Sequence, residues 1–595
     1  MEAMTTDRLS LKLGARPEKG GVRFRVWAPS ARRMQVVLEG QGAEKPMVQR
    51  AGGHFEAFVP GLAAGALYRY RVNGKDVYPD PASRFQPHGV HGPSMVVDPG
   101  FEWQDGDWTG APQSDLVFYE LHVGTFTPQG TFAGVQSKLA HLKTLGVTAI
   151  ELMPVAEYPG RWSWGYDPAA QFAPSRAYGR PDDLRRLVEA AHLEGLAVFL
   201  DVVYNHFGPD GAYAVALAPQ FFSERHSTPW GRAINLDGEH SAGVRRFYLE
   251  NALYWLEEYH FDGFRLDATF ALIDDSDTHF LAELADVVSS ATGWRRLLVA
   301  EDDRNWRRVL EPRTSGGYGL DAVWADDFHH QVRVNLAGDK HGYYRDYSGV
   351  GGDIANTIEQ GWFYTGQHSQ HAGKKRGSDT SGLAFEQFVL CIQNHDQIGN
   401  RPHGNRLTED VSMEAYRAAS ALLLFAPELP LLFMGQEWAA STPFQYFTDH
   451  HEALGKMVSE GRRDEFKDFP GFAGEVPDPQ DERTFRRSML DWQEVETGVH
   501  AQTLAYYRDL LKLRKGLSPG VTVAIPAADA LELRRGDRIL QVALRRGVTL
   551  PEPGEFEPYW SSEAPEYTDD PSPPRRDKDG TFFRVPAAVL WRPPA

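Results

Sequence analysis

Four carboxylic acids stand where predicted β-strands end. Asp201, Asp267, Glu301 and Asp396 each close or follow an apolar run of strand length. A parallel barrel presents its reactive groups at this edge, and two carboxyl groups held close together can cleave a glycosidic bond. A single acid in such a position more often caps a helix or forms a salt bridge. Four successive acids that fit one spatial plan favour the catalytic interpretation.

Eight apolar segments, which alternate with helical segments, must position these acids. Strands that are apolar throughout and alternate with helices are typical of a parallel sheet covered on both faces. Eight such strands close a barrel. The predicted strands are 116–121, 146–152, 195–203, 261–266, 297–300, 322–325, 388–393 and 429–434, and helices are expected at 181–192 and 502–514. We therefore predict an α/β fold with a catalytic (β/α)8 TIM barrel.

Short alternating segments flank the barrel on both sides and predict two small β-sandwiches. The predicted domains are residues 1–98, the barrel with its excursions at 99–515, and residues 516–595. Asn73 and Gly74 lie between two alternating runs and predict a hairpin turn. Residues 99–112 are expected to form a linker, and the Pro- and Glu-rich stretch 551–574 is expected to be a loop.

Composition excludes several classes of partner. The chain has 62 Lys and Arg against 81 Asp and Glu, a formal charge of −19, which repels nucleic acid and anionic lipid surfaces. Cys391 is the single cysteine, so no intramolecular disulfide can form. Residues 1–10 are polar, and no apolar run is long enough to cross a bilayer. We expect a cytoplasmic protein that acts on a neutral substrate.

The segments around the four acids resemble the signature regions of the α-amylase superfamily. These segments are 201–206, 263–268, residue 301 and 394–396, joined by the Trp-Gly-Tyr-Asp-Pro motif at 164–168. The flanking sandwiches fit the same superfamily, the first as an immunoglobulin-like, carbohydrate-binding-module-like domain. The resemblance implies that Asp267 is the nucleophile, Glu301 the acid/base and Asp396 a third acid that holds sugar hydroxyls. Arg265 shares a strand face with Asp267 and should keep its carboxylate ionised.

The resemblance also implies substrate-binding roles for other residues. His206 and His395 match histidines that bond sugar hydroxyls, and Tyr166 matches a residue that stacks on the ring. Asp201 is expected to support the site rather than react. Asn205 aligns with a calcium-binding position of some relatives, but no complete oxygen cage can be identified, so no metal is predicted.

Wider motifs are similar to those of maltooligosyltrehalose trehalohydrolases. Residues 393–401 read Gln-Asn-His-Asp-Gln-Ile-Gly-Asn-Arg, whereas Ser-His-Asp-Glu is usual in glucan-branching enzymes and His-Asp-Gly in debranching enzymes. Similar stretches lie at 80–87, 89–94, 274–276, 279–281, 324–330 and 443–450. His88 departs from the pattern, because an acidic residue is common there. The departure lies outside the catalytic motifs.

This resemblance implies hydrolysis of the α-1,4 bond next to the terminal trehalose of maltooligosyl trehalose. Other α-1,4-glucans are possible ligands, and the synthase that makes the substrate is the implied metabolic partner. No organic cofactor is implied, because the hydrolysis needs only carboxylates and water. Two alternatives remain open: a glucan-branching or debranching enzyme, and a non-catalytic α-glucan-binding protein. A protein of the second kind would be expected to have lost one of the three acids.

Selection of trehalose should depend on loops that follow the barrel strands. The first choice is the segment from Trp324 to His330, with Asp326 and Asp327 as hydroxyl acceptors and Phe328 as an apolar wall. Packing of the barrel top is the alternative for both aromatic residues. Tyr446 and the loop 362–376 are second choices.

Two pairs of adjacent histidines, at 329–330 and 450–451, invite a metal-binding interpretation. Adjacent side chains at a strand end are expected to diverge. We therefore expect hydrogen-bonding or substrate-contact roles for them.

Overall fold

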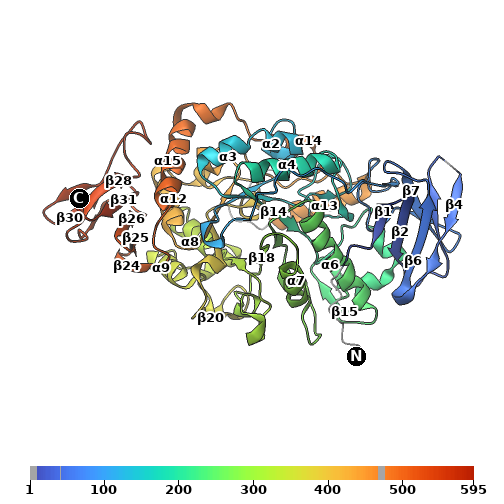
Figure 1. Ribbon diagram of the computed structural model, residues 1–595. Coiled ribbons are helices and arrows are strands. Elements are labelled where there is room, and N and C mark those ends of the chain that lie inside the picture. Colours follow the sequence, from blue (N-terminus) through green and yellow to red (C-terminus); the bar gives the residue numbers. More distant parts are fainter. Residues whose placement is uncertain (1–9, 41, 467–475, 595) are drawn as a thin grey trace.

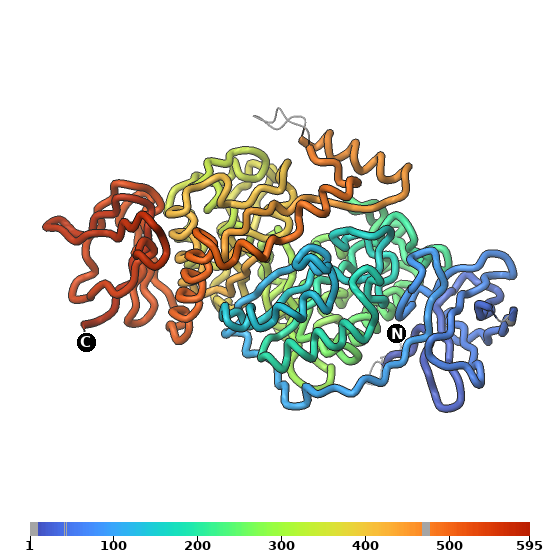
Figure 2. The backbone as a smooth tube through the Cα atoms, turned by 90° about the horizontal axis from the view of Figure 1, so that it is seen from above, coloured from blue at the N-terminus to red at the C-terminus, as the bar shows by residue number. Residues whose placement is uncertain are grey.

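The computed structural model describes residues 10–40, 42–466 and 476–594. The N-terminal strands and the C-terminal strands lie at opposite ends of the molecule, with the barrel between them (Figures 1 and 2). The polar segment expected at residues 1–10 falls outside the described residues except for Ser10. Among the described residues, no helix combines the length and the apolar character needed to cross a membrane.

The eight predicted strands are all present and close into a parallel barrel. Their side chains are almost all buried, because helices cover the outside and other side chains fill the inside. The register of the third and fourth strands sets Asp201 beside Arg265. The strands are β10 (Phe118–Leu121), β11 (Ala149–Leu152), β14 (Ala197–Val202), β17 (Gly263–Leu266), β18 (Leu297–Glu301), β19 (Ala322–Trp324), β22 (Phe388–Cys391) and β23 (Leu429–Phe433).

The helix predicted at 181–192 is α4, which spans Pro181–Leu193. Pro181 occupies its first turn, and the Asp183 carboxylate accepts the backbone N–H of Arg180 at 2.8 Å. Acidic residues in the first turn of a helix are stabilising, because their negative charge lies near the positive end of the helix dipole. Other helices around the barrel are α3 (Leu139–Leu145), α6 (Ser241–Glu258), α7 (Phe280–Ser289), α8 (Asp327–Leu336), α9 (Gly351–Gln360), α12 (Met413–Phe425) and α15 (Gly498–Arg514).

The N-terminal strands form two facing antiparallel sheets around their own apolar core. The predicted hairpin turn is present: Asn73 and Gly74 both have positive φ, 52° and 72°, as a two-residue turn of this kind requires. One sheet contains β1 (Gly14–Glu18), β2 (Gly21–Trp27), β6 (His54–Pro60) and β5 (Val48–Gln49). The other contains β4 (Ala43–Pro46), β3 (Met34–Leu38), β7 (Leu67–Val72), β8 (Val77–Tyr78) and β9 (Ser94–Met95).

The C-terminal strands form a five-stranded and a three-stranded antiparallel sheet. The expected loop at 551–574 is partly wrong, because it contains the strand β28 (Glu557–Ser561). β28 is an edge strand, where Pro558 is tolerated because its missing N–H need not complete a ladder. The larger sheet also holds β24 (Thr522–Ala527), β25 (Ala530–Arg535), β26 (Arg538–Ala543) and β31 (Ala587–Arg592). The smaller holds β27 (Val548–Leu550), β30 (Gly580–Phe583) and β29 (Arg575–Asp577).

A buried ion pair joins the barrel to the C-terminal sheets. Arg417 of α12 donates from Nε to Glu563 Oε1 at 2.9 Å and from Nη2 to Oε2 at 2.5 Å. The two side chains are 3% and 0% exposed. Removing one partner would leave the other charge buried without compensation.

We therefore expect Glu563→Ala to lower the free energy of unfolding by about 3 kcal/mol. Urea unfolding followed by tryptophan fluorescence measures this loss. Glu552→Ala is the matched control, because Glu552 pairs with Arg576 at the surface and should leave the transition unchanged. Equal transitions for the two variants would contradict a stabilising role for the buried pair.

Candidate active site

A cavity of about 360 Å³ opens where the carboxyl ends of the barrel strands meet. It brings together the three predicted catalytic acids and four of the ten predicted substrate-binding residues. Its lining includes Asp267, Glu301, Asp396, Tyr166, His206, His395 and Tyr446. Residues more than 200 positions apart in the chain therefore share one site, as the barrel topology predicts.

Arg265 lies below this cavity and is fully buried. Its Nη1 is 2.8 Å from Asp201 Oδ2 and 2.9 Å from Asp267 Oδ1. Its Nη2 is 2.9 Å from Glu301 Oε2. One planar guanidinium thus holds three carboxyl groups in a water-poor environment, where charge interactions are stronger than in bulk water. Asp267 and Glu301 are bound by its two Nη atoms and must therefore lie close together.

Asn205 supplies the second contact to Asp267. Its Nδ2 donates to Asp267 Oδ2 at 2.8 Å and to the backbone carbonyl of Asp267 at 2.9 Å. The Asp267 carboxylate is therefore held at both oxygens while its side chain stays 11% exposed to the cavity. The amide that the resemblance compared with a calcium-binding position is a hydrogen-bond donor to the carboxylate here.

Glu301 stands in an environment that favours its protonated form. Burial raises the pKa of Glu301 well above its usual value, and the negative charges of Asp267 and Asp396 raise it further. Arg265 and the Ala268 backbone N–H, which donates to Glu301 Oε2 at 2.7 Å, oppose this shift. The net shift is upward, so the carboxyl group can hold a proton at a pH where an ordinary Glu is ionised.

Asp396 is the most accessible of the three acids, with a side chain that is 34% exposed. It lies in the first turn of the short helix α10 (His395–Gly399), which Asn394 caps by accepting the Gln397 N–H at 2.8 Å. Asn400 donates to Asp396 Oδ1 at 3.1 Å. The carboxylate is thus oriented by its own helix and free to accept hydroxyl groups from the cavity.

Glu120 is a site residue that the sequence did not reveal. It lies on β10 and accepts from the His395 backbone N–H at 3.0 Å and from His395 Nδ1 at 2.5 Å. Burial works against a charged imidazole, but Asp396 and Glu120 together raise the pKa of His395 to about 9. The ring is therefore a cation at neutral pH. An acid inside the apolar run 116–121 was the available signal for this role.

Aromatic rings form two walls of the cavity. Tyr166 stacks on His395 with ring centroids 5.1 Å apart, and its hydroxyl donates to Asp201 at 2.6 Å. His206 stacks on Trp230 with centroids 5.2 Å apart and an angle of 6°. Trp230 is 49% exposed at the tip of the hairpin of β15 (Phe222–Thr228) and β16 (Gly231–Ile234). No sequence signal distinguished this tryptophan.

The resting contacts of His206 differ from the predicted bond to a sugar hydroxyl. Its Nε2 lies 2.8 Å from the Tyr166 carbonyl oxygen, and its Nδ1 contacts the Asn205 side chain. One of these contacts must be exchanged if the ring is to bond a substrate.

Two of the residues expected to select trehalose do not face the cavity. Phe328 is fully buried in the barrel core, so it forms no apolar wall for a ligand. Trp324 is 5% exposed, and the guanidinium of Arg265 lies 4.3 Å from its ring centre. Both residues therefore follow the alternative prediction that they pack the barrel top, because β19 and α8 direct their side chains into the protein interior.

The adjacent acids of the same segment have different surroundings. Asp327 is fully buried and accepts from Asn305 Nδ2 at 2.6 Å, the Tyr347 hydroxyl at 2.5 Å and the Phe363 N–H at 2.8 Å. Its oxygens are thus occupied by Asn305, by Tyr347 and by Phe363 of the second-choice loop 362–376, and they are not available to a substrate. Asp326 is half-buried, and burial together with the charges of Asp396 and Asp327 raises its pKa to about 7.

The first pair of adjacent histidines does not diverge as expected. His329 and His330 lie in α8, and their Nδ1 atoms are 3.0 Å apart. Burial lowers the pKa of both rings, to about 3 for His330, so the pair is neutral and shares a hydrogen bond. His450 Nε2 is 3.3 Å from Asp167 Oδ2 beside the cavity, whereas His451 is exposed.

One group of three possible metal ligands occurs within the described part of the chain. It consists of His226, Asp237 and Asp275, near the base of the hairpin that carries Trp230. The Arg225 guanidinium lies 2.5 Å from the Asp237 carboxylate and already balances its charge. The arrangement is therefore that of an ion-pair cluster.

We expect Glu120→Gln to lower the pKa of His395 from its value of about 9, because the variant removes one of the two charges that stabilise the imidazolium. Carbon-13 NMR of histidine-labelled protein measures the titration, with His395→Gln assigning the signal. Glu552→Gln, far from the site, is the control. An unshifted titration in Glu120→Gln would contradict this electrostatic role.

Comparison with known proteins agrees with the geometry. The chain matches the family model "Alpha amylase, catalytic domain" over residues 78–222. It matches "Carbohydrate-binding module 48 (Isoamylase N-terminal domain)" over residues 12–99. A pullulanase from Paenibacillus barengoltzii complexed with maltotriose has a TM-score of 0.72 at 20% identity over 99% of this chain and 97% of that one, a likeness of fold alone.

More similar proteins narrow the family. Malto-oligosyltrehalose trehalohydrolase of Deinococcus radiodurans is 51% identical over 85% of this chain and 83% of that protein. The protein of the same name from Saccharolobus solfataricus is 43% identical over 85% and 87%. The crystal structure of a putative α-amylase from Salmonella typhimurium is 37% identical with a TM-score of 0.89, over 98% of this chain and 100% of that one. The chain therefore belongs to the malto-oligosyltrehalose trehalohydrolase family of α-amylase-type glycoside hydrolases.

Proposed function

We propose that the cavity hydrolyses the α-1,4 bond next to the terminal trehalose of maltooligosyl trehalose and releases free trehalose. The observation that supports this proposal is that Arg265 contacts both Asp267 and Glu301 beside a cavity lined by several of the predicted substrate-binding residues. Family membership supports the choice of substrate. Two carboxyl groups held so close favour a retaining mechanism, which needs a separation of roughly 5 Å.

In the first step, an Asp267 oxygen attacks the anomeric carbon of the sugar on the non-trehalose side. The bond from that carbon to the glycosidic oxygen breaks, and Glu301 gives its proton to this oxygen, so trehalose leaves with an intact hydroxyl group. Burial raises the pKa of Glu301 and so keeps its carboxyl group protonated, which allows Glu301 to supply this proton. Hydrogen bonds from Arg265 and Asn205 to its two oxygens orient the Asp267 carboxylate for the attack.

In the second step, the Glu301 carboxylate takes a proton from water, and the hydroxide oxygen displaces Asp267 from the anomeric carbon. The two inversions restore the α configuration. Asp396 accepts hydroxyl groups of the distorted sugar ring, and the cationic ring of His395 donates to the same sugar. The glucan chain leaves shortened by one trehalose unit.

We assign the selection of maltooligosyl trehalose over maltooligosaccharides to Asp326 and Tyr446 rather than to the whole segment 324–330. Tyr446 lines the cavity, and Asp326 lies near enough to Asp396 for their charges to interact. Trehalose joins two glucoses through both anomeric carbons, so it bends differently from maltose. If the half-buried Asp326 carboxyl group accepts one hydroxyl group of trehalose, a ligand that leaves Asp326 without a hydrogen bond reacts more slowly. Asp327 serves indirectly by fixing the loop 362–376.

The proposed substrate also implies a metabolic partner. A maltooligosaccharide becomes a substrate only after its reducing end has been converted to trehalose. A maltooligosyl trehalose synthase must therefore supply the substrate.

Asp267→Asn should reduce turnover to below a hundredth of wild type, because the amide keeps the shape but cannot form the glycosyl ester. Steady-state release of trehalose measures this, with circular dichroism as the control for folding. Activity above a hundredth, in protein shown by mass spectrometry to be free of deamidation, would refute the nucleophile assignment.

The pH profile should report the proton on Glu301. Its raised pKa means that the protonated acid persists above the usual Glu range, and kcat/KM should fall as pH rises through that raised value. Glu301→Gln should nearly abolish cleavage of maltooligosyl trehalose, yet slow glycosyl-enzyme formation far less with an aryl glucoside, whose leaving group needs no proton. Equal losses in the pre-steady-state burst of both substrates would contradict the acid role.

Wild-type enzyme should prefer maltooligosyl trehalose over a maltooligosaccharide of equal length by at least ~100-fold in kcat/KM, about 2.7 kcal/mol. Asp326→Ala should narrow this ratio about tenfold, while Asp379→Ala, an exposed acid elsewhere, should leave it unchanged. Equal rates on both substrates, or new branch points in amylose, would favour a general glucanase or a branching enzyme. An unchanged ratio in Asp326→Ala would place selection elsewhere.

A further inference from the structure

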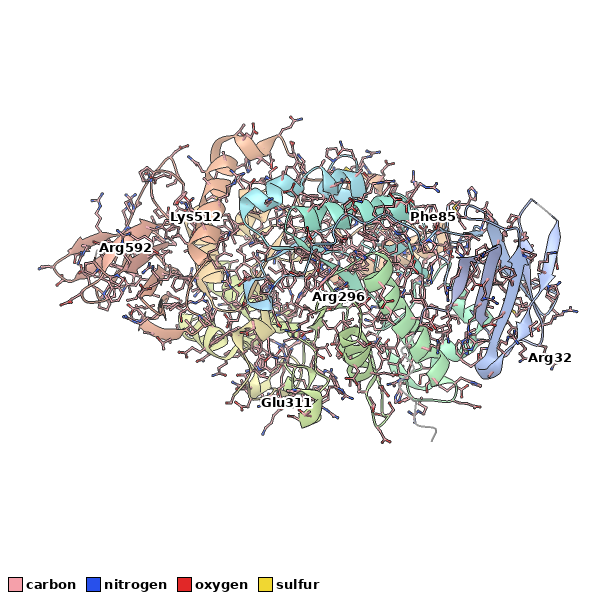
Figure 3. All side chains as sticks on the ribbon, viewed as in Figure 1. Arg32, Phe85, Arg296, Glu311, Lys512 and Arg592 are labelled. Atoms are coloured by element: carbon pink, nitrogen blue, oxygen red, sulfur yellow. The ribbon has the colours of Figure 1, made fainter. Side chains whose placement is uncertain are left out.

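A second crevice lies far from the active site, between the last barrel helix and the C-terminal sheet. Its volume is about 600 Å³. Figure 3 labels Lys512 on α15 and Arg592 at the end of β31, both toward the C-terminal end of the molecule. Its basic and aromatic lining includes Lys512, Lys515, Arg535, Arg538, Tyr559 and Arg592.

The lining of the crevice carries an excess of positive charge. Five Lys and Arg side chains face two carboxylates, Asp509 and Asp537. Asp509 accepts the Tyr567 hydroxyl at 2.6 Å, and Asp537 is already paired with Arg538 at 2.8 Å. The chain as a whole has a formal charge of −19. A cationic pocket on so acidic a protein attracts anions that the rest of the surface repels.

The two lysines of the lining are exposed and lack a carboxylate partner. Within residues 10–40, 42–466 and 476–594, no ion pair or hydrogen bond engages the ammonium group of Lys512 or Lys515. Their position at the end of α15 is favourable in itself, because cations stabilise the negative end of a helix dipole. That explanation does not extend to the three arginines, which come from the sheet of another domain.

Arg535 forms the floor of the crevice and is 5% exposed. It donates to the backbone carbonyl oxygens of Ser518 at 2.6 Å, Phe425 at 2.9 Å and Ala426 at 3.1 Å. Burial lowers its pKa only to about 10, so it is a cation at neutral pH. Burial raises the pKa of the neighbouring Glu428 to about 8, so this carboxyl group is mostly uncharged and leaves Arg535 without an anion.

Tyr559 fixes the two remaining arginines. The guanidinium of Arg592 lies 5.2 Å from the centre of its ring, and that of Arg538 lies 5.9 Å from it. Such cation–π contacts hold the cations in place and leave their N–H groups able to donate. Arg592 also contacts Glu557 at 2.9 Å, which further restricts its side chain. The three arginine side chains of the lining are therefore restricted by contacts within the protein before any ligand arrives.

We propose that this crevice binds a small molecule in which a phosphate group is attached to a ring, such as a phosphorylated sugar or a nucleoside monophosphate. A doubly charged phosphate matches fixed guanidinium forks and free ammonium groups better than a neutral glucan does. The volume exceeds that of a phosphate group alone, and Leu513, Leu517 and Trp560 offer apolar surface to the attached ring. The site is separate from the glycoside-cleaving cavity.

Isothermal titration calorimetry of the full chain at constant ionic strength tests this site. The ligands are glucose 6-phosphate, AMP, inorganic phosphate and, as a neutral reference, maltotetraose. The variant Lys512→Gln/Lys515→Gln removes the two unpaired ammonium groups, and Arg592→Gln removes a charge from the opposite wall. Lys19→Gln, an exposed lysine of the N-terminal domain, is the matched control, and circular dichroism checks folding.

We expect either glucose 6-phosphate or AMP to bind with one molecule per protein chain. That ester should bind more tightly than inorganic phosphate. Its affinity should fall at least about tenfold in each crevice variant and stay unchanged in Lys19→Gln. The ester that binds more tightly identifies the attached ring as sugar or nucleoside. The proposal is overturned if neither ester binds at about 10 mM, or if the crevice variants bind as well as the control. Equal affinity for inorganic phosphate and both esters would also overturn it.

Discussion

The guanidinium group of Arg265 is the contact on which the arrangement of the active site depends. It lies at the level of Asp201 because β14 and β17 pair in that register, and it binds Asp267 and Glu301 through separate nitrogen atoms. A guanidinium group with no exposure to water requires acceptors for its N–H groups, and the carboxyl groups of Asp201, Asp267 and Glu301 lie within 2.9 Å of it. The same interaction that stabilises the buried arginine therefore fixes the two groups that the mechanism needs.

The surrounding charges divide these acids into different protonation states. Burial raises the pKa of Asp201 to about 6 in spite of Arg265, and the Tyr166 hydroxyl donates to it. Deeper in the barrel, burial and the charges of Glu120 and Asp201 keep the pKa of Glu151 well above its usual value. A fully ionised set would repel itself strongly, whereas this arrangement keeps some carboxyl groups neutral. Glu301 belongs to the neutral set, which suits an acid that must donate a proton.

Much of this site could be predicted from the sequence, because apolar runs show where the barrel strands end. Asp267, Glu301 and Asp396 follow apolar runs, and the barrel topology alone brings such positions to one edge. Glu120 was missed because its role requires knowing that β10 and β22, the strand preceding His395, lie on either side of β23 in the closed barrel. Trp230 was missed because only the folded hairpin places it against His206. Such contacts depend on loop conformation, which local pattern does not specify.

The segment 324–330 shows a second reason why sequence pattern alone did not predict the whole site. Its composition of acids and aromatic residues suggested a binding loop, but α8 begins at Asp327 and turns Phe328 into the core. Asp326, which directly precedes this helix, is half-buried, whereas Asp327 in its first turn is fully buried. Strand β28 was missed for a related reason, since pairing with β31 outweighs its weak local preference.

Product stereochemistry tests most directly whether Arg265 holds Asp267 and Glu301 as a retaining pair. Proton NMR during the first minutes of hydrolysis resolves the anomers of the new reducing end before mutarotation mixes them. The α-anomer is expected to appear first, since two displacements at one carbon restore its configuration. Initial appearance of the β-anomer would mean a single displacement by water and would contradict the central role given to this pair.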